Sequence, residues 1–137
     1  MNVPYLSISS LFLLFPIILF VYKNQQNIYE TILAGLLLIN IVLSFLFWQN
    51  PIKNSTIHFY DGIFGKISFL FCCIYVLFVK ELEQSMKLIF ISLLIATLIL
   101  FYYSNDHSSK NWYSKEHIMY HFTFHSFMSL GCCIAFI

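Results

Sequence analysis

Five apolar stretches fill most of this chain of 137 residues and limit what it can fold into more than any other feature does. A helix needs roughly 20 apolar residues to cross a bilayer, so five such helices use about 100 positions. The polar residues left over form only short connections. Because a backbone in lipid must satisfy its polar groups internally, the sequence predicts an all-α, polytopic transmembrane helical bundle with short loops.

The expected helices lie within a single transmembrane domain of residues 1–137. They cover residues 4–22, 28–48, 57–79, 86–104 and 112–137. The first is expected to be a retained membrane helix, because no basic residue precedes its apolar run, and Pro16 is expected to kink it. Residues 104–115 are polar and turn-like, and we expect them to form the longest connection.

Composition supports this location and restricts the partners. Hydrophobic residues make up 60% of the chain, charged residues 9%, and the mean hydropathy is +0.80, which is typical of an integral membrane protein. All seven basic residues are lysines and the net charge is +1, so a nucleic-acid surface is not expected. The expected partners are membrane lipids, and a homo-oligomer is compatible with so small a bundle. The lysines are balanced between the two sides, so they identify neither the orientation nor the membrane.

Two pairs of cysteines lie within the apolar runs, at Cys72-Cys73 and Cys132-Cys133. Neighbouring residues point to different sides of a helix, so neither pair forms a metal clip or an easy disulfide. We expect these cysteines to pack as small apolar side chains.

Isolated polar residues mark two other positions. Asn40 and Ser44 form a short polar stripe at spacing four on the second expected helix, where hydrogen bonding between helices is favoured over catalysis. Ser55 is expected to cap the third helix, because its hydroxyl can accept a free amide of the first turn.

Three of the five histidines open the last apolar stretch, at His117, His121 and His125. Spacing four places them along one stripe of a helix, drifting only about 40° per step. The first and last are about 12 Å apart along the axis, so all three do not easily share one ion.

A second polar cluster opens the third helix. His58, Asp61 and Lys66 share an arc of roughly 140° with Gly62 and Gly65. This face is therefore expected to look into protein, with the two glycines allowing a neighbouring helix to come close.

Alternating passage through the bilayer brings these clusters to one side. The end of the second span and the starts of the third and fifth then lie in the same half of the membrane. The residues expected to meet there are Ser44, His58, Asp61, His117 and His121.

Such a cluster predicts a metal site. An adjacent histidine pair of the last helix, His117 with His121 or His121 with His125, joins His58 in a three-histidine zinc site. Asp61 would orient a ligand or take a proton from metal-bound water, and Ser44 would hold the water or an oxyanion. The alternative is that interfacial histidines and tyrosines simply sit among lipid headgroups.

These residues resemble the CREST superfamily of membrane hydrolases, which includes the alkaline ceramidases and the progestin and adipoQ receptors. The shared pattern is a serine, a histidine, an aspartate and a His-x-x-x-His pair. Here these are Ser44, His58, Asp61 and either His117–His121 or His121–His125. The resemblance implies a zinc ion held by three histidines and hydrolysis of a lipid amide or ester. Where the family commonly has a histidine four residues after the serine, this chain has Trp48.

Two non-hydrolytic readings stay open. In the first, Asp61, Lys66 and the histidines form a proton or ion pathway, or the protein is a structural envelope protein without enzymatic activity. A pairing of Lys66 with Asp61 would favour this reading. In the second, His58 and His121 hold a haem between helices.

Overall fold

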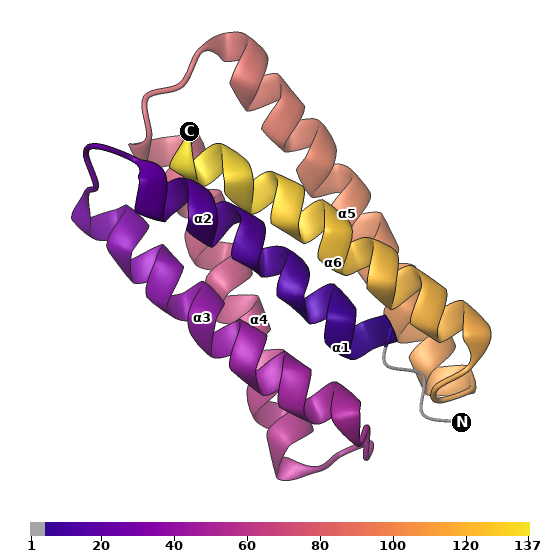
Figure 1. Ribbon diagram of the computed structural model, residues 1–137. Coiled ribbons are helices and arrows are strands. Elements are labelled where there is room, and N and C mark those ends of the chain that lie inside the picture. The colour runs from indigo at the N-terminus through magenta and orange to yellow at the C-terminus, as the bar shows by residue number, and fades with distance from the viewer. Residues whose placement is uncertain (1–4) are drawn as a thin grey trace.

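The computed structural model describes residues 5–137, and this part of the chain consists of helices joined by short connections, without strands (Figure 1). The predicted all-α bundle is confirmed. Residue 4, where the first helix was expected to begin, lies outside the described residues. The elements are α1 (Tyr5–Ser10), η1 (Leu11–Leu13), α2 (Leu14–Tyr22), α3 (Ile28–Gln49), α4 (Thr56–Ile74), η2 (Tyr75–Val79), α5 (Gln84–Lys110) and α6 (Lys115–Phe136).

Four helical segments are long and apolar enough to cross a membrane: Tyr5–Tyr22, Ile28–Gln49, Thr56–Val79 and Gln84–Lys110. The helix α6 is not among them. It is as long as α3, but three histidines and several hydroxyl side chains make it less apolar. It nevertheless packs along α5 and along the segment formed by α1, η1 and α2.

The helices form an arc rather than a closed ring. The segment α1–η1–α2 lies between α3 and α6, as Figure 1 shows. On the outer side of α3 packs α4, and on the outer side of α6 packs α5. Although α4 and α5 follow each other in sequence, their backbones do not pack closely against each other, and α4 and η2 contact α6 instead. The arc is therefore open between these two helices.

The first span is interrupted where the sequence predicts a kink. The 3-10 turn η1 ends shortly before Pro16, which is fully buried. A proline has no N–H to donate to the carbonyl four residues earlier, which here belongs to Phe12. The hydroxyl of Ser129 on α6 donates to that carbonyl oxygen across 2.6 Å. The kink is therefore tied to a neighbouring helix.

The expected loop over residues 104–115 is wrong, because α5 continues to Lys110. Lys110 pairs with Asp106 one turn earlier, with 2.7 Å between Nζ and Oδ2. On the side facing α6, the His107 ring stacks on Tyr120 with 5.2 Å between centroids. These contacts stabilise the polar C-terminal residues of α5 in a helix. Only residues 111–114 separate α5 from α6.

The end of the bundle opposite the histidines holds a buried ion-pair cluster. Glu30 is fully buried, and its Oε1 accepts hydrogen bonds from Lys23 at 2.7 Å, Lys80 at 3.1 Å and the Tyr75 hydroxyl at 2.9 Å. Desolvation lowers the pKa of Lys80, and the Glu30 carboxylate opposes that shift. The cluster ties α3 to the connection that precedes it, to η2 and to the connection between η2 and α5.

The cysteines pack as expected from the sequence. All four are free, and Cys72 and Cys132 belong to the main apolar core with Leu33, Leu37 and Val76. This core occupies the half of the bundle away from the histidines.

Candidate functional site

A cavity of about 350 Å³ lies between α4 and α5, at the end of the bundle where α3 ends and α4 and α6 begin. The six residues that the sequence singles out all line it, although they come from three helices. They are Ser44, His58, Asp61, His117, His121 and His125. Their convergence is thus a feature of the structure, while their chemical roles stay predictions.

One wall of the cavity is the polar arc of α4. Asp61 and Lys66 line it together with Gly62 and Gly65. A Cβ added at either glycine would meet no atom within 4 Å. The expectation that a neighbouring helix packs closely on these glycines is therefore wrong. They widen the cavity instead.

His58 and His117 take part in the same capping motif at the starts of α4 and α6. The backbone N–H of Asn54 donates to Nδ1 of His58 at 3.0 Å, and that of Tyr113 donates to Nδ1 of His117 at 3.2 Å. Asn54 and Tyr113 adopt the left-handed conformation, with φ of 63° and 64°. This arrangement resembles a capping box with histidine in place of glutamate or glutamine.

The serines complete the motif. Ser55 and Ser114 are the N-caps, and their hydroxyl oxygens accept from the backbone N–H of His58 and His117 at 3.3 Å and 3.2 Å. The predicted capping role of Ser55 is therefore confirmed. Because each Nδ1 accepts a hydrogen bond, the proton of each neutral ring sits on Nε2.

His121 and His125 are held differently, by hydroxyls of neighbouring helices. Nδ1 of His121 lies 3.0 Å from the Ser104 hydroxyl on α5, and Nδ1 of His125 lies 2.7 Å from the Ser9 hydroxyl on α1. The two ring centroids are 4.6 Å apart. The Ser104 hydroxyl can donate to Nδ1 of His121 or accept from it, so both tautomers of His121 are compatible with this contact. The Ser9 hydroxyl donates its proton to the Leu6 carbonyl at 2.9 Å, so it accepts a hydrogen bond from Nδ1 of His125.

The histidines do not fit the predicted zinc site in this arrangement. A metal ligand needs a free lone pair on the ring nitrogen, whereas His58 and His117 have one nitrogen occupied by a backbone N–H and a proton on the other. Over residues 5–137, no group of three or more His, Cys, Asp or Glu side chains is placed to hold a metal ion. The zinc centre stays a prediction from the sequence.

Asp61 and Lys66 line the same cavity without pairing. The ion pairs of the described chain join Glu30 to Lys23 and Lys80, and Asp106 to Lys110. The pairing that would favour an ion pathway is therefore not formed. A carboxylate and an ammonium are both available to a third group.

The polar stripe of α3 makes the interhelical hydrogen bonds favoured by the sequence. Ser10 on α1 donates to the Ser44 hydroxyl at 2.8 Å, and the Asn40 amide donates to the Ser68 hydroxyl on α4. The Ser10 hydroxyl also donates to the Leu6 carbonyl at 3.0 Å, so its single proton is shared between two acceptors.

Sequence reasoning did not place Trp48 and Asn40 at the cavity. Both residues line it, while Nε1 of Trp48 and Oδ1 of Asn40 are themselves buried and have no hydrogen-bond partner within residues 5–137. Trp48 stacks on Trp112 with 6.1 Å between centroids and lies 4.9 Å from the His121 ring. A signal was present, because Trp48 follows Ser44 at spacing four on the same helix face.

Sequence reasoning also missed the first span as part of the site. Ser9 and Ser10 are fully buried and contact His125 and Ser44. The cluster of serines within an otherwise apolar run was the available signal.

Comparison of the chain with protein families, with curated proteins and with solved structures finds no match. The resemblance to the CREST superfamily therefore continues to depend on the short motifs alone.

Proposed function

We propose that this chain is a multi-pass membrane protein whose polar cavity binds the polar part of an amphiphilic molecule of the bilayer. The proposal depends on one observation. Asp61 and Lys66 line the cavity, and neither side chain forms an ion pair within the described chain. Unpaired ionisable groups inside a membrane protein are costly, so groups that line a cavity are usually satisfied by what fills it.

The other groups in the cavity suit the same occupant. Besides the carboxylate acceptor and the ammonium donor, the Nε2 protons of His58 and His117 add two neutral donors. Polar groups of both kinds in an otherwise apolar lining favour a neutral or zwitterionic head group.

A proton or ion pathway is less well supported by this arrangement. Such a pathway needs polar groups across the whole membrane. The polar lining is confined to one half, and the apolar core around Leu33, Leu37 and Val76 fills the other half of the described bundle.

Hydrolysis of a lipid amide or ester is the reaction that we propose for this cavity. The unpaired Asp61 carboxylate would take a proton from the attacking water, and neutral N–H donors such as Nε2 of His58 would stabilise the oxyanion. Collapse of the tetrahedral intermediate would break the C–N or C–O bond, and Asp61 would return the proton to the departing amine or alcohol. The proposal does not use a metal.

Binding can be measured with the protein's own fluorescence. The chain has two tryptophans, and Trp48 and Trp112 both line the cavity. We would titrate hexadecylglycerol, a single-chain ether that cannot be hydrolysed, into nanodiscs of dioleoyl phosphatidylcholine. We expect the tryptophan emission to change and to saturate at one ligand per chain. A response that does not saturate, or no response, would overturn the binding proposal.

Hydrolysis needs its own assay. We would follow release of fatty acid from N-palmitoylethanolamine and from monopalmitoylglycerol. Asp61→Asn should lower the rate by about 10²-fold or more, whereas Asp106→Asn, which removes a half-buried carboxylate outside the cavity, should not. Equal rates in wild type and Asp61→Asn would show that Asp61 takes no part in the reaction. Elemental analysis of the same samples would test the zinc site that the sequence predicts.

A further inference from the structure

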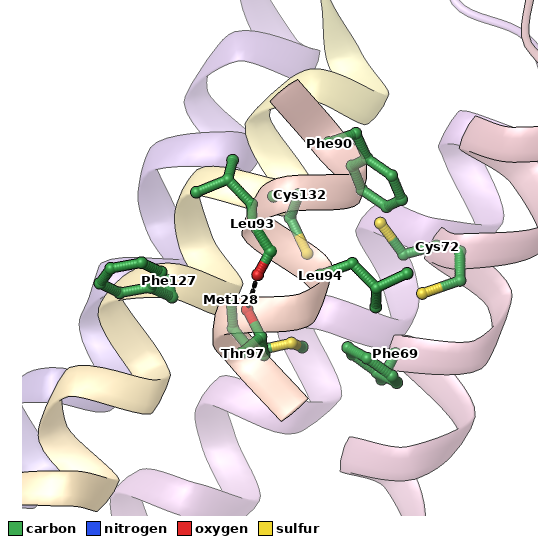
Figure 2. A pocket seen from close by; sticks show the side chains of 11 residues that line it. Phe69, Cys72, Phe90, Leu93, Leu94, Thr97, Phe127, Met128 and Cys132 are labelled. Carbon is green, nitrogen blue, oxygen red and sulfur yellow. Dashed lines mark hydrogen bonds between the residues drawn. The ribbon is translucent and has the colours of Figure 1, made fainter. Parts of the chain in front are cut away.

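The cleft between α4 and α5 continues beyond the polar cavity. A second cavity of about 20 Å³ adjoins it toward the other end of the bundle. Phe69, Thr97 and Met128 line both cavities and form the boundary between them. In Figure 2, Leu94 points from α5 toward α4, where Phe69 and Cys72 lie.

This second space is apolar. Phe90, Leu93 and Leu94 contribute its α5 side. Its hydroxyl group, that of Thr97, donates to the Leu93 carbonyl of the same helix at 2.7 Å, as the dashed line in Figure 2 marks. This hydroxyl is thus satisfied internally, and the space suits hydrocarbon.

The polar cavity opens sideways, toward lipid. Leu98 and Phe101 line it and are also 48% and 41% exposed. The helix α5 has 27 residues, or about 40 Å at 1.5 Å per residue, and Leu98 lies near its middle. The hydrocarbon core of a bilayer is about 30 Å thick, so this opening faces acyl chains rather than water.

We propose that the cleft holds one single-chain amphiphile, which enters sideways between α4 and α5. Its polar group lies in the polar cavity and its acyl chain follows the cleft to the apolar one. This inference rests on the proposed function and names its ligand class. From Ser104 at the polar cavity to Phe90 at the apolar one, α5 extends about 21 Å, which suits a long chain. The apolar cavity has room for a methyl-sized group, so it admits the end of one chain rather than two.

Chain length is the first test. Octylglycerol, dodecylglycerol and hexadecylglycerol would be titrated in the same nanodiscs, beside the two-chain dihexadecylglycerol. Leu94→Phe fills the apolar cavity and should weaken binding of the hexadecyl compound about tenfold, while octyl binding is unchanged. Ile95→Phe is the matched control, because Ile95 is 55% exposed on the neighbouring position of α5. Equal losses for all chain lengths, or tighter binding of the two-chain compound, would overturn the inference.

Filling the polar cavity is the second test. Gly65→Leu places a side chain where nothing lies within 4 Å, so the fold should tolerate it. All chain lengths should then bind at least tenfold more weakly. Gly35→Leu on α3 is the control, because Gly35 also has open space around it but does not line the cavity.

The outcomes separate this inference from the proposed function. Binding that is saturable but independent of chain length would retain the polar site and reject the acyl path. Absence of binding by every compound would reject both. A second copy of the chain is the competing occupant of the cleft. Cross-links between cysteines introduced at Leu98 of two copies, together with loss of ligand binding on dimerisation, would assign the cleft to an interface and overturn the inference.

Discussion

The backbone N–H of Asn54 donates to Nδ1 of His58 across 3.0 Å. The backbone just before α4 therefore holds the His58 ring, which lines the cavity, in place. The same relationship joins Tyr113 to His117. In each case the backbone decides which ring nitrogen carries the proton. A residue type that suggests metal binding in the sequence thus acts as a helix cap and a neutral hydrogen-bond donor.

Replacing either capping histidine should lower stability. His58→Ala leaves the Asn54 N–H without its acceptor and should reduce the free energy of unfolding by about 1 kcal/mol. His58→Gln should recover part of this loss, because glutamine serves the same position in a capping box. Unfolding midpoints in mixed detergent micelles would measure both. A midpoint for His58→Ala equal to that of wild type would contradict the capping role.

Trp48 and Trp112 should separate binding from stability. Nε1 of Trp48 has no partner in the described chain, whereas Nε1 of Trp112 donates to the Pro51 carbonyl at 3.2 Å. Trp48→Phe tests whether an occupant of the cavity reaches this N–H, and binding of hexadecylglycerol should then weaken by about fivefold, the equivalent of one hydrogen bond of about 1 kcal/mol. Trp112→Phe should instead reduce stability by a similar free energy. The idea fails if Trp48→Phe binds the ligand as tightly as wild type.

The contact between Ser129 and Phe12 can be tested with a double-mutant cycle. Ser129→Ala should cost about 1 kcal/mol in the wild-type background, because it removes a donor from a carbonyl that Pro16 leaves without its helical partner. With Pro16→Ala, a backbone N–H becomes available to that carbonyl, and the effect of Ser129→Ala should shrink. Additive effects in the unfolding midpoint would show that the two positions are independent.

The buried ion-pair cluster should matter more than the exposed pair on α5. Glu30→Gln leaves Lys23 and Lys80 together without their counter-charge, which we expect to cost on the order of 3 kcal/mol. Asp106→Asn breaks only the pair with the largely exposed Lys110 and should cost less than about 1 kcal/mol. Comparable shifts of the unfolding midpoint would contradict this ranking.

Much of the fold can be predicted from the sequence. Apolar runs predict four helical segments within a few residues of their observed ends, namely Tyr5–Tyr22, α3, Thr56–Val79 and α6. The histidines at spacing four share one face of α6. The C-terminal part of α5 was not predicted, because its polar residues are typical of a turn. Tertiary contacts such as the stacking of His107 on Tyr120, with local pairing of Asp106 and Lys110, stabilise it as helix.

The sequence by itself determined that this protein is an all-α bundle and that Ser44, His58, Asp61 and the histidines of α6 lie toward one end of it. Only the tertiary structure decided that α4 and α5 stay apart, that Ser9 reaches His125 from 116 residues away, and that Trp48 and Asn40 keep unpaired groups at a cavity. The physical reason is that hydrophobicity inserts helices into a bilayer but does not pair them, because lipid tails are as apolar as leucine. Side-chain shape and interhelical hydrogen bonds select the neighbours.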